Sequence, residues 1–127
     1  MTRTYTTRHG AGPLPCETDG KPHARIEDAT NIANEFQGAL RFGWLEPAQL
    51  VSDIRADLAS AGTNAVTPNL VVTCADQIDG PKLSVVVDGH RREESFEEVL
   101  SGIKAGIGGA RVLVACGPTR RDVRVGG

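Results

Sequence analysis

The chain has 127 residues, a length that suits one compact domain and leaves little room for a second. Its 14 basic and 16 acidic residues give a net charge of −2, so it lacks the excess positive charge on which nucleic-acid binding depends. No apolar stretch approaches the roughly 20 residues that span a bilayer, and the N-terminus lacks the apolar core of a signal peptide. Cys16, Cys74 and Cys116 fit neither a disulfide framework nor a compact zinc site. We therefore expect a cytoplasmic protein with reduced thiols, no metal site, and no nucleic-acid or membrane partner.

The first half of the chain predicts one strand and one helix. Residues 3–8 (RTYTTR) are β-prone, whereas two glycines and two prolines make residues 9–15 a loop. Residues 16–34 are polar and show no period. A helix is expected at 47–61, because Pro47 suits the first helical position and apolar residues recur on one face (Leu50, Val51, Ile54 and Leu58).

The second half predicts three strands and a second helix. Strands are expected at 69–73 and 82–88, and a last strand at 111–115 runs into an arginine-rich tail (Arg120, Arg121 and Arg124) that we expect to be solvated. Between them, Ser95 and Glu98 form an S-x-x-E capping box, a helical apolar period comes next, and Gly106 ends the helix. The alternation of strands and helices predicts an α/β fold with two main helices, formed as a single domain over residues 1–127.

Four segments carry a family resemblance. They are residues 5–17 (YTTRHGAGPLPCE), 34–46 (NEFQGALRFGWLE), 72–80 (VTCADQIDG) and 114–120 (VACGPTR). In this order they resemble the motifs YTTRVGAGPFPTE, NEFG…R…GWLD, LTKLDVLDG and STGP-x-R of adenylosuccinate synthetase. The segments are spread over nearly the whole chain, and the second is shorter than its counterpart. The resemblance implies the C-terminal portion of such an enzyme, and hence a partial lobe of a larger mixed sheet.

The family's chemistry defines what the resemblance implies about function. The family joins aspartate to inosine monophosphate with GTP and Mg²⁺: a phosphoryl group goes to the purine 6-oxygen, and the aspartate amine then displaces it. The chain would thus be a carbon–nitrogen ligase of AMP biosynthesis that binds a purine nucleotide (GTP or ATP) and a nucleoside monophosphate. The family's phosphate loop and catalytic residues have no counterpart in this sequence. We therefore expect no catalytic residue and no Mg²⁺ ligand here, and a partner chain carrying the phosphate loop, or a homodimer.

The third and fourth segments imply a site for the nucleotide base, formed by Cys74, Asp76, Cys116, Gly117 and Pro118. Asp76 comes just after an expected strand, where ligands bind in α/β sheets, and its carboxylate can accept both N–H hydrogens of a guanine edge. The alternative is that Asp76 only begins a turn or caps the next short segment. Because Cys74 stands where the family has a lysine, the sequence leaves open whether this site binds an adenine nucleotide or no nucleotide at all. We expect Cys74 and Cys116 to be buried small residues and not a metal pair.

The first two segments imply a substrate site formed by Arg8, Gly10, Gly12, Gly38 and Arg41. Arg41 is the single arginine of the shortened segment, and a guanidinium is a natural clamp for carboxylate or phosphate. The glycines allow backbone to approach a ribose or phosphate closely. A surface role for Arg41 is the alternative.

Three functions stay open on the sequence alone. The chain is a portion of a split or truncated ligase, a non-catalytic purine-nucleotide-binding remnant with a regulatory or partner-docking role, or a fragment without a ligand. We expect it to expose apolar surface where a partner packs.

Overall fold

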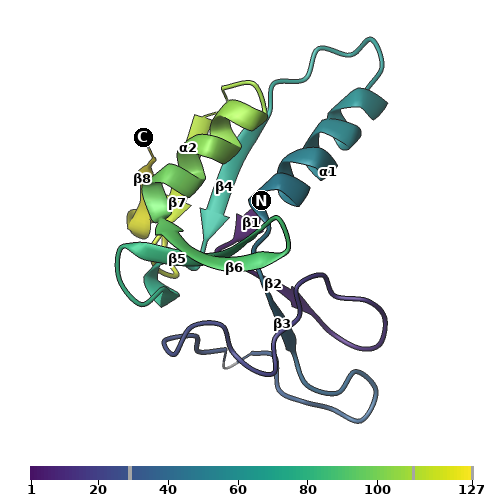
Figure 1. Ribbon diagram of the computed structural model, residues 1–127, viewed down its shortest axis with the longest axis vertical. Helices are drawn as coiled ribbons and strands as arrows, with labels where there is room; N and C mark the ends of the chain where they lie inside the picture. Colours follow the sequence, from purple (N-terminus) through teal and green to yellow (C-terminus); the bar gives the residue numbers. More distant parts are fainter. Residues whose placement is uncertain (29, 110, 127) are drawn as a thin grey trace.

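The computed structural model describes residues 1–28, 30–109 and 111–126. It shows an α/β fold with two helices, as the sequence predicts (Figure 1). Helix α1 spans Pro47–Ser60 and helix α2 spans Phe96–Gly106. The other elements are the strands β1 (Thr2–Arg3), β2 (Tyr5–Arg8), β3 (Arg41–Trp44), β4 (Asn69–Thr73), β5 (Lys82–Val87), β6 (His90–Ser95), β7 (Arg111–Ala115) and β8 (Val123–Val125), and the short 3-10 helices η1 (Ala75–Gln77) and η2 (Arg120–Asp122).

The main sheet has four strands in the order β1-β4-β7-β8. Strands β1, β4 and β7 are parallel, with Val72 paired to Thr2 on one side and to Val114 on the other. Strand β8 is antiparallel to β7, so the arginine-rich tail is partly an ordered edge strand, although its arginines are exposed as expected. The carboxyl ends of the parallel strands meet at one edge of this sheet, where α/β proteins bind ligands.

Two antiparallel hairpins complete the fold. Strands β2 and β3 pair Tyr5 with Trp44 and Arg8 with Arg41, and this hairpin with its long loops lies at the bottom of Figure 1, below the helices. The strand expected at 3–8 is therefore divided between two sheets. The chain changes sheets at Thr4, which is fully buried and donates from its hydroxyl to the carbonyl oxygen of Cys74 (3.3 Å). Local β propensity does not reveal such a change of sheet.

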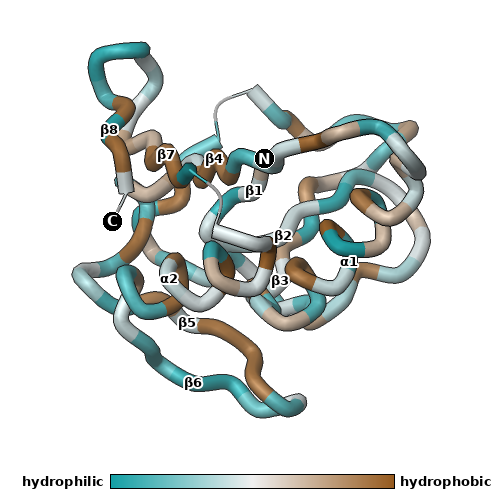
Figure 2. Tube along the Cα trace, turned by 90° about the horizontal axis from the view of Figure 1, so that it is seen from above, coloured by the Kyte–Doolittle hydropathy of each residue, from teal (hydrophilic) through white to brown (hydrophobic). Residues whose placement is uncertain are grey.

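The β5–β6 hairpin contains a strand that the sequence analysis did not predict. The expected strand at 82–88 ends at Val87, and Asp88 and Gly89 form a tight turn with φ of 52° and 75°. An Asp-Gly pair with both residues at positive φ is typical of a two-residue hairpin turn, so this signal was present in the sequence. Strand β6 is polar and exposed, whereas β5 is apolar and buried, a contrast visible in Figure 2.

Helix α2 has the expected extent but not the expected cap. Ser95 is the N-cap residue, yet its side chain makes no capping hydrogen bond, so the predicted capping box is wrong. The first helical N–H, that of Phe96, instead donates to the carbonyl oxygen of Pro81 (3.0 Å). At the other end of α2, Gly109 N–H donates to the carbonyl oxygen of Lys104 (2.9 Å). Gly108 has a φ of 86°, a conformation that favours glycine at a helix end.

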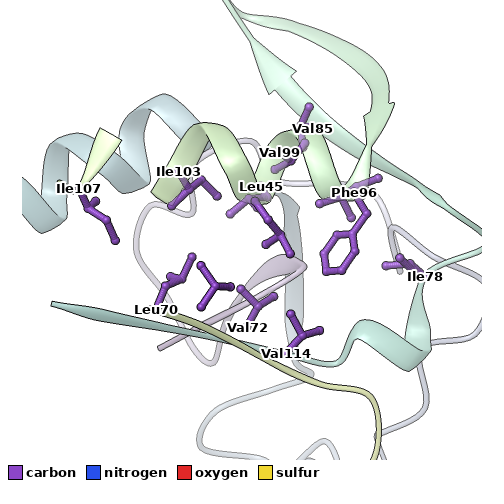
Figure 3. Close-up of a cluster of buried hydrophobic side chains, with 13 residues drawn as sticks. Leu45, Leu70, Val72, Ile78, Val85, Phe96, Val99, Ile103, Ile107 and Val114 are labelled. Atoms are coloured by element: carbon purple, nitrogen blue, oxygen red, sulfur yellow. The ribbon is translucent and has the colours of Figure 1, made fainter. Parts of the chain in front are cut away.

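The main core lies between α2 and the sheets (Figure 3). Its α2 members are the four apolar residues whose period predicted the helix, and each is at most 5% exposed (Phe96, Val99, Leu100 and Ile103). Helix α1 packs on α2 where a Cβ on Gly106 would lie 2.8 Å from both methyl carbons of Val51. Within α1, all of which the structure describes, no side chain is fully buried. The expected apolar face of α1 is therefore only half covered.

A second, smaller core fixes the loop at 23–26 to the β2–β3 hairpin. It contains Tyr5, Ile26 and Phe42, with His23 buried beside it. The Tyr5 hydroxyl donates to the Gln77 side chain (2.6 Å), and burial is the main reason that the pKa of Tyr5 is raised to about 12. The sequence analysis found no regular structure in 16–34 and did not predict this cluster.

In the described part of the chain, neither helix is long and apolar enough to cross a membrane.

Leu100→Ala should destabilise the fold by about 2–5 kcal/mol, because it leaves a cavity in the main core. The matched change Leu58→Ala, on the half-buried face of α1, should cost about 1 kcal/mol or less. Urea unfolding followed by circular dichroism measures both. Equal losses would contradict the placement of the core on α2.

The free energy of unfolding should fall on acidification through His23. Burial lowers the pKa of His23, and nearby Asp79 opposes this only in part. The unfolded chain therefore takes up a proton on His23 at higher pH than the folded chain does. The contribution of neutral, buried His23 to the free energy of unfolding is fully present above pH ~6.5. It is lost as pH falls through the lowered folded-state pKa of His23.

Urea unfolding between pH 7 and pH 5 measures this dependence. His23→Phe should flatten it, whereas the matched change His90→Phe, at an exposed position, should leave it unchanged. An unaltered slope in His23→Phe would refute the assignment.

Candidate nucleotide site

The carboxyl edge of the parallel strands forms a hollow of about 230 Å³. Strand β4 ends there at Thr73 and β7 at Ala115, so the third and fourth segments meet as expected. Four of the five residues predicted to hold a base line this hollow: Cys74, Asp76, Gly117 and Pro118. The fifth, Cys116, lines a neighbouring hollow that shares Asp76.

Asp76 presents a free carboxylate at this edge. It lies in η1, is exposed, and makes no side-chain hydrogen bond or ion pair within residues 1–28, 30–109 and 111–126. Cys74 begins η1 in the left-handed conformation (φ 61°), and its carbonyl oxygen accepts from Gln77 N–H (3.2 Å). The chain thus turns sharply after β4 and leaves the Asp76 carboxylate available to a ligand.

Gly117 is required by the turn on the opposite wall. A Cβ at this position would lie 2.8 Å from the carboxyl carbon of Asp122. That carboxylate accepts from the backbone N–H (2.9 Å) and the hydroxyl (2.6 Å) of Thr119, which lowers the pKa of Asp122. These contacts hold η2 against the end of β7 and so shape the wall that includes Pro118.

The two cysteines differ in exposure. Cys74 is half-buried, but Cys116 is exposed, which corrects the expectation that both are buried. Cys116 lies just past the end of β7, at the rim where the sheet no longer covers it. No three His, Cys, Asp or Glu side chains form a potential metal site in the part of the chain that the structure describes.

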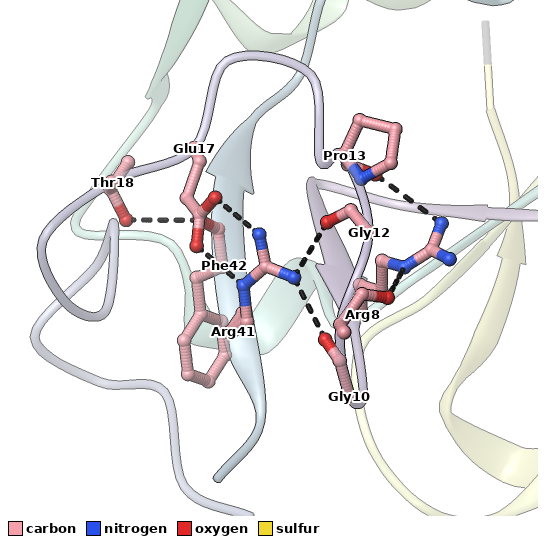
Figure 4. A network of polar contacts seen from close by, with 9 residues as sticks. Arg8, Gly10, Gly12, Pro13, Glu17, Thr18, Arg41 and Phe42 are labelled. Atoms are coloured by element: carbon pink, nitrogen blue, oxygen red, sulfur yellow. Dashed lines mark hydrogen bonds and ion pairs between the residues drawn. The ribbon is translucent and has the colours of Figure 1, made fainter. Parts of the chain in front are cut away.

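The predicted substrate residues form a separate group on the β2–β3 hairpin, and Figure 4 shows Arg8, Gly10, Gly12 and Arg41 of this group. Arg41 donates from Nε and Nη2 to the two carboxylate oxygens of Glu17 (2.6 and 2.5 Å). Its Nη1 donates to the carbonyl oxygens of Gly10 (2.8 Å) and Gly12 (2.9 Å). Four of the five N–H groups of a guanidinium are thereby used, and the bonds from Arg41 lower the pKa of Glu17. Arg41 thus holds the first two segments together, while its role toward a substrate stays a prediction.

Arg8 is likewise turned toward its own loop. It donates to the carbonyl oxygens of Ala11 (3.1 Å) and Pro13 (3.3 Å). Its guanidinium lies so close to Gly12 that a Cβ there would come within 2.7 Å of Nη2. Gly12 also has a φ of 105°, so both its conformation and this close approach call for glycine.

Gly10 and Gly38 join the two loops. Gly10 N–H donates to the carbonyl oxygen of Gln37 (3.0 Å), one residue before Gly38. Gly38 N–H donates back to Asn34 (2.8 Å) and closes a tight turn with a φ of 66°. The expected substrate residues therefore do come together, through contacts among themselves.

The base site and the hairpin group lie on different sheets but are linked. The hydrogen bond from Tyr5 on β2 to Gln77 in η1 spans the two regions. Sequence reasoning did not single out Tyr5, Glu17, Arg25 or Gln77. Tyr5, Glu17 and Gln77 lie inside the matched segments, which is the only signal that pointed to them.

Comparison with known proteins supports the resemblance. No family model matches the chain. It is 32% identical over 119 residues to the adenylosuccinate synthetase of Acidithiobacillus ferrooxidans, which is 93% of this chain and 24% of the relative. It is 32% identical over 104 residues to that of Bordetella pertussis, a match that covers 79% of this chain and 21% of the relative. It is 28% identical over 129 aligned residues to that of Nitrosospira multiformis, a match that covers 97% of this chain and 26% of the relative. The predicted resemblance to adenylosuccinate synthetase is confirmed, and the chain spans about a quarter of the length of the curated relatives it matches.

Arg41→Ala should loosen the loops of the β2–β3 hairpin, because it removes four donated hydrogen bonds. The amide of Gly10, which bonds across to the second loop, should exchange its hydrogen faster. Hydrogen–deuterium exchange by NMR measures this. The matched change Arg92→Ala, at an exposed position on β6, should leave exchange at Gly10 unchanged.

The Glu17–Arg41 ion pair should respond to acid. Because the pKa of Glu17 is lowered in the fold, the stability that this pair gives the loops is present above the unfolded-state pKa of Glu17. That stability is lost as pH falls through the folded-state pKa. Glu17→Gln should make the loop insensitive to this change. Protection at Gly10 that does not depend on pH in the unmodified protein would contradict the assignment.

Proposed function

We propose that the chain is the base- and acceptor-binding portion of an adenylosuccinate synthetase-like ligase of cytoplasmic AMP biosynthesis. The observation that carries this proposal is the free Asp76 carboxylate in the hollow where the third and fourth segments meet. The similarity to named adenylosuccinate synthetases over most of the chain supports it. The proposed reaction joins inosine monophosphate and aspartate and is driven by a nucleoside triphosphate.

The proposed recognition of the base derives from the donor and acceptor pattern of a purine. A carboxylate accepts two parallel hydrogen bonds from the N1–H and exocyclic amine of guanine. Cys74 and Pro118 would flank the base, and Gly117 leaves room for it. Because Cys74 offers neither the length nor the charge of the family's lysine, the contact to the base rests on Asp76.

The proposed acceptor site is the loop pair held by Arg41. At this end of the hairpin Gly12 and Gly38 are exposed, and Gly10 is half-buried. Phosphoryl transfer would require groups outside this chain, since no phosphate loop is among its motifs. Among the described residues, no three His, Cys, Asp or Glu side chains are grouped as metal ligands, so the Mg²⁺ of the proposed reaction would need other ligands.

A second candidate function is a non-catalytic module that binds a purine nucleotide. The observation that favours it is the Glu17–Arg41 pair, which leaves one N–H of the guanidinium for a substrate. The two candidates share the base site and differ in whether Arg41 contacts an acceptor.

Calorimetric titration with GTP, ATP and inosine monophosphate in the presence of Mg²⁺ tests the base site. We expect one nucleoside triphosphate to bind, and Asp76→Ala to weaken it by about tenfold or more, because two charge-assisted hydrogen bonds are lost. Asp57→Ala, an exposed position on α1, is the matched control. Binding that is the same in Asp76→Ala, or no binding at millimolar nucleotide, would refute the assignment of the base site.

A further inference from the structure

One face of the main sheet is covered by helices, and the other face is bare. On the covered face, the second and fourth residues of β4 and β7 are buried under α2 (Leu70, Val72, Val112 and Val114). Helix α1 lies on the same side, because Leu50, Val51 and Ile54 pack against this core. In Figure 2, α2 lies on one side of β4 and β7. Both described helices therefore cover the same face.

The bare face carries the alternate residues of the same strands. Successive side chains of a strand point to opposite faces, so Val71 on β4 and Leu113 on β7 point away from the helices, and both are only half-buried. Val125 on the edge strand β8 is paired with Leu113, so it belongs to this face, and so does Val123 two residues earlier. The two valines are 61% and 40% exposed. An apolar surface thus extends across three strands.

The sequence of these strands is typical of strands that are covered on both faces. Strand β4 contains residues 70–72 (LVV) and β7 contains residues 112–114 (VLV), with no polar residue in either run. Parallel strands occur almost only in sheets with both faces covered, and such strands read as continuous apolar runs. The four apolar residues of the bare face all lie outside the four segments that carry the family resemblance. Neither the resemblance nor the candidate sites account for this surface.

The bare face carries positive charge at its margin. Alternation along β7 places exposed Arg111 on this face, in register with Asn69 of β4. Pairing with Thr73 places Arg3 there as well, but its guanidinium lies over the ring of Tyr5, 5.8 Å from the centroid. No acidic residue stands at the face positions of these strands. Any molecule that covers the face must therefore keep its own cations away from Arg111.

A second copy of the same face meets this condition. A twofold axis that runs parallel to the strands, between β4 and β7, lays β4 of one copy over β7 of the other. Val71 then lies over Leu113 of the second copy, and Arg111 lies over Asn69 and not over another cation. Val125 faces the start of β1 in the second copy, where Met1 is 93% exposed. The face is thus complementary to itself, as a contact about a twofold axis requires.

We propose that a second copy of this chain covers the bare face, so that two main sheets stack about this twofold axis. Packed sheets lie about 10 Å apart with their strands within about 30° of each other, a space that the aliphatic side chains of this face fill. The inference does not rest on the proposed function. It concerns the same edge, because Thr73 and Ala115 also line the hollow of about 230 Å³, the smaller of the two hollows there. The axis would place the smaller hollows of both copies at one edge of the pair.

Analytical ultracentrifugation of the full chain tests this inference. The mean mass should rise from that of one chain toward that of two between micromolar and millimolar concentration. Leu113→Lys and Val125→Lys should each raise the dissociation constant by about tenfold or more, because each places an unpaired cation in the contact. The matched change Val66→Lys, at a position that is 53% exposed and lies in the loop after α1, should leave the dissociation constant unchanged. Val125→Lys changes an exposed edge position, so it tests the contact even if Leu113→Lys impairs folding.

NMR of a mixture of isotope-labelled and unlabelled chains tests the placement of the two sheets. Nuclear Overhauser effects between copies should join the methyl groups of Val71 to those of Leu113. A chain that stays monomeric at millimolar concentration would overturn the proposal, and so would a dimer that Val125→Lys leaves intact or whose contacts between copies centre on α1. If the dimer forms as described but no nucleotide binds, the proposed function fails and this inference stands.

Discussion

The parallel pairing of β4 with β7 places the ends of two segments that lie about forty residues apart in the chain on one edge of the sheet. Strand β4 delivers Asp76 to this edge, and β7 delivers Gly117, so the two walls of the smaller hollow depend on the pairing of Val72 with Val114. The same edge borders the neighbouring hollow that Cys116 lines. Both hollows therefore depend on a register that is fixed by fully buried valines in the main core.

The Arg41 guanidinium has a comparable organising role on the β2–β3 hairpin. A guanidinium presents its N–H groups in a fixed plane, so it can satisfy the Glu17 carboxylate and two carbonyl oxygens at once. A lysine cannot reproduce that pattern from a single ammonium group. A ligand carboxylate that takes the place of Glu17 on Arg41 has to match a bidentate contact that the loop already makes. If the proposed acceptor binds at this hairpin, its binding is therefore coupled to the order of the loops.

Elements with a strong local pattern could be predicted from the sequence, and elements defined by distant contacts could not. The period of Phe96, Val99, Leu100 and Ile103 predicted α2, and Pro47 with the apolar face after it predicted the start of α1. Strand β6 is polar because it is exposed, so hydropathy gave no signal and the Asp-Gly turn was the remaining evidence. The burial of His23 and Ile26 depends on the hairpin beside them and has no local signature. For the candidate site, the motif order predicted that Cys74, Asp76, Gly117 and Pro118 would meet. Arg25 lines the neighbouring hollow, which it joins only through tertiary packing.

The two regions differ in how ready they are for a ligand. Asp76 has no protein partner in the described residues, whereas Arg41 has donated most of its hydrogen bonds to its own loops. A buried phenol joins the regions, because the Tyr5 hydroxyl reaches from β2 to the Gln77 side chain beside Asp76. Since Gln77 also lines the smaller hollow, a ligand that displaces its side chain breaks this bond and leaves the buried Tyr5 hydroxyl without an acceptor, at a cost of about 1–3 kcal/mol.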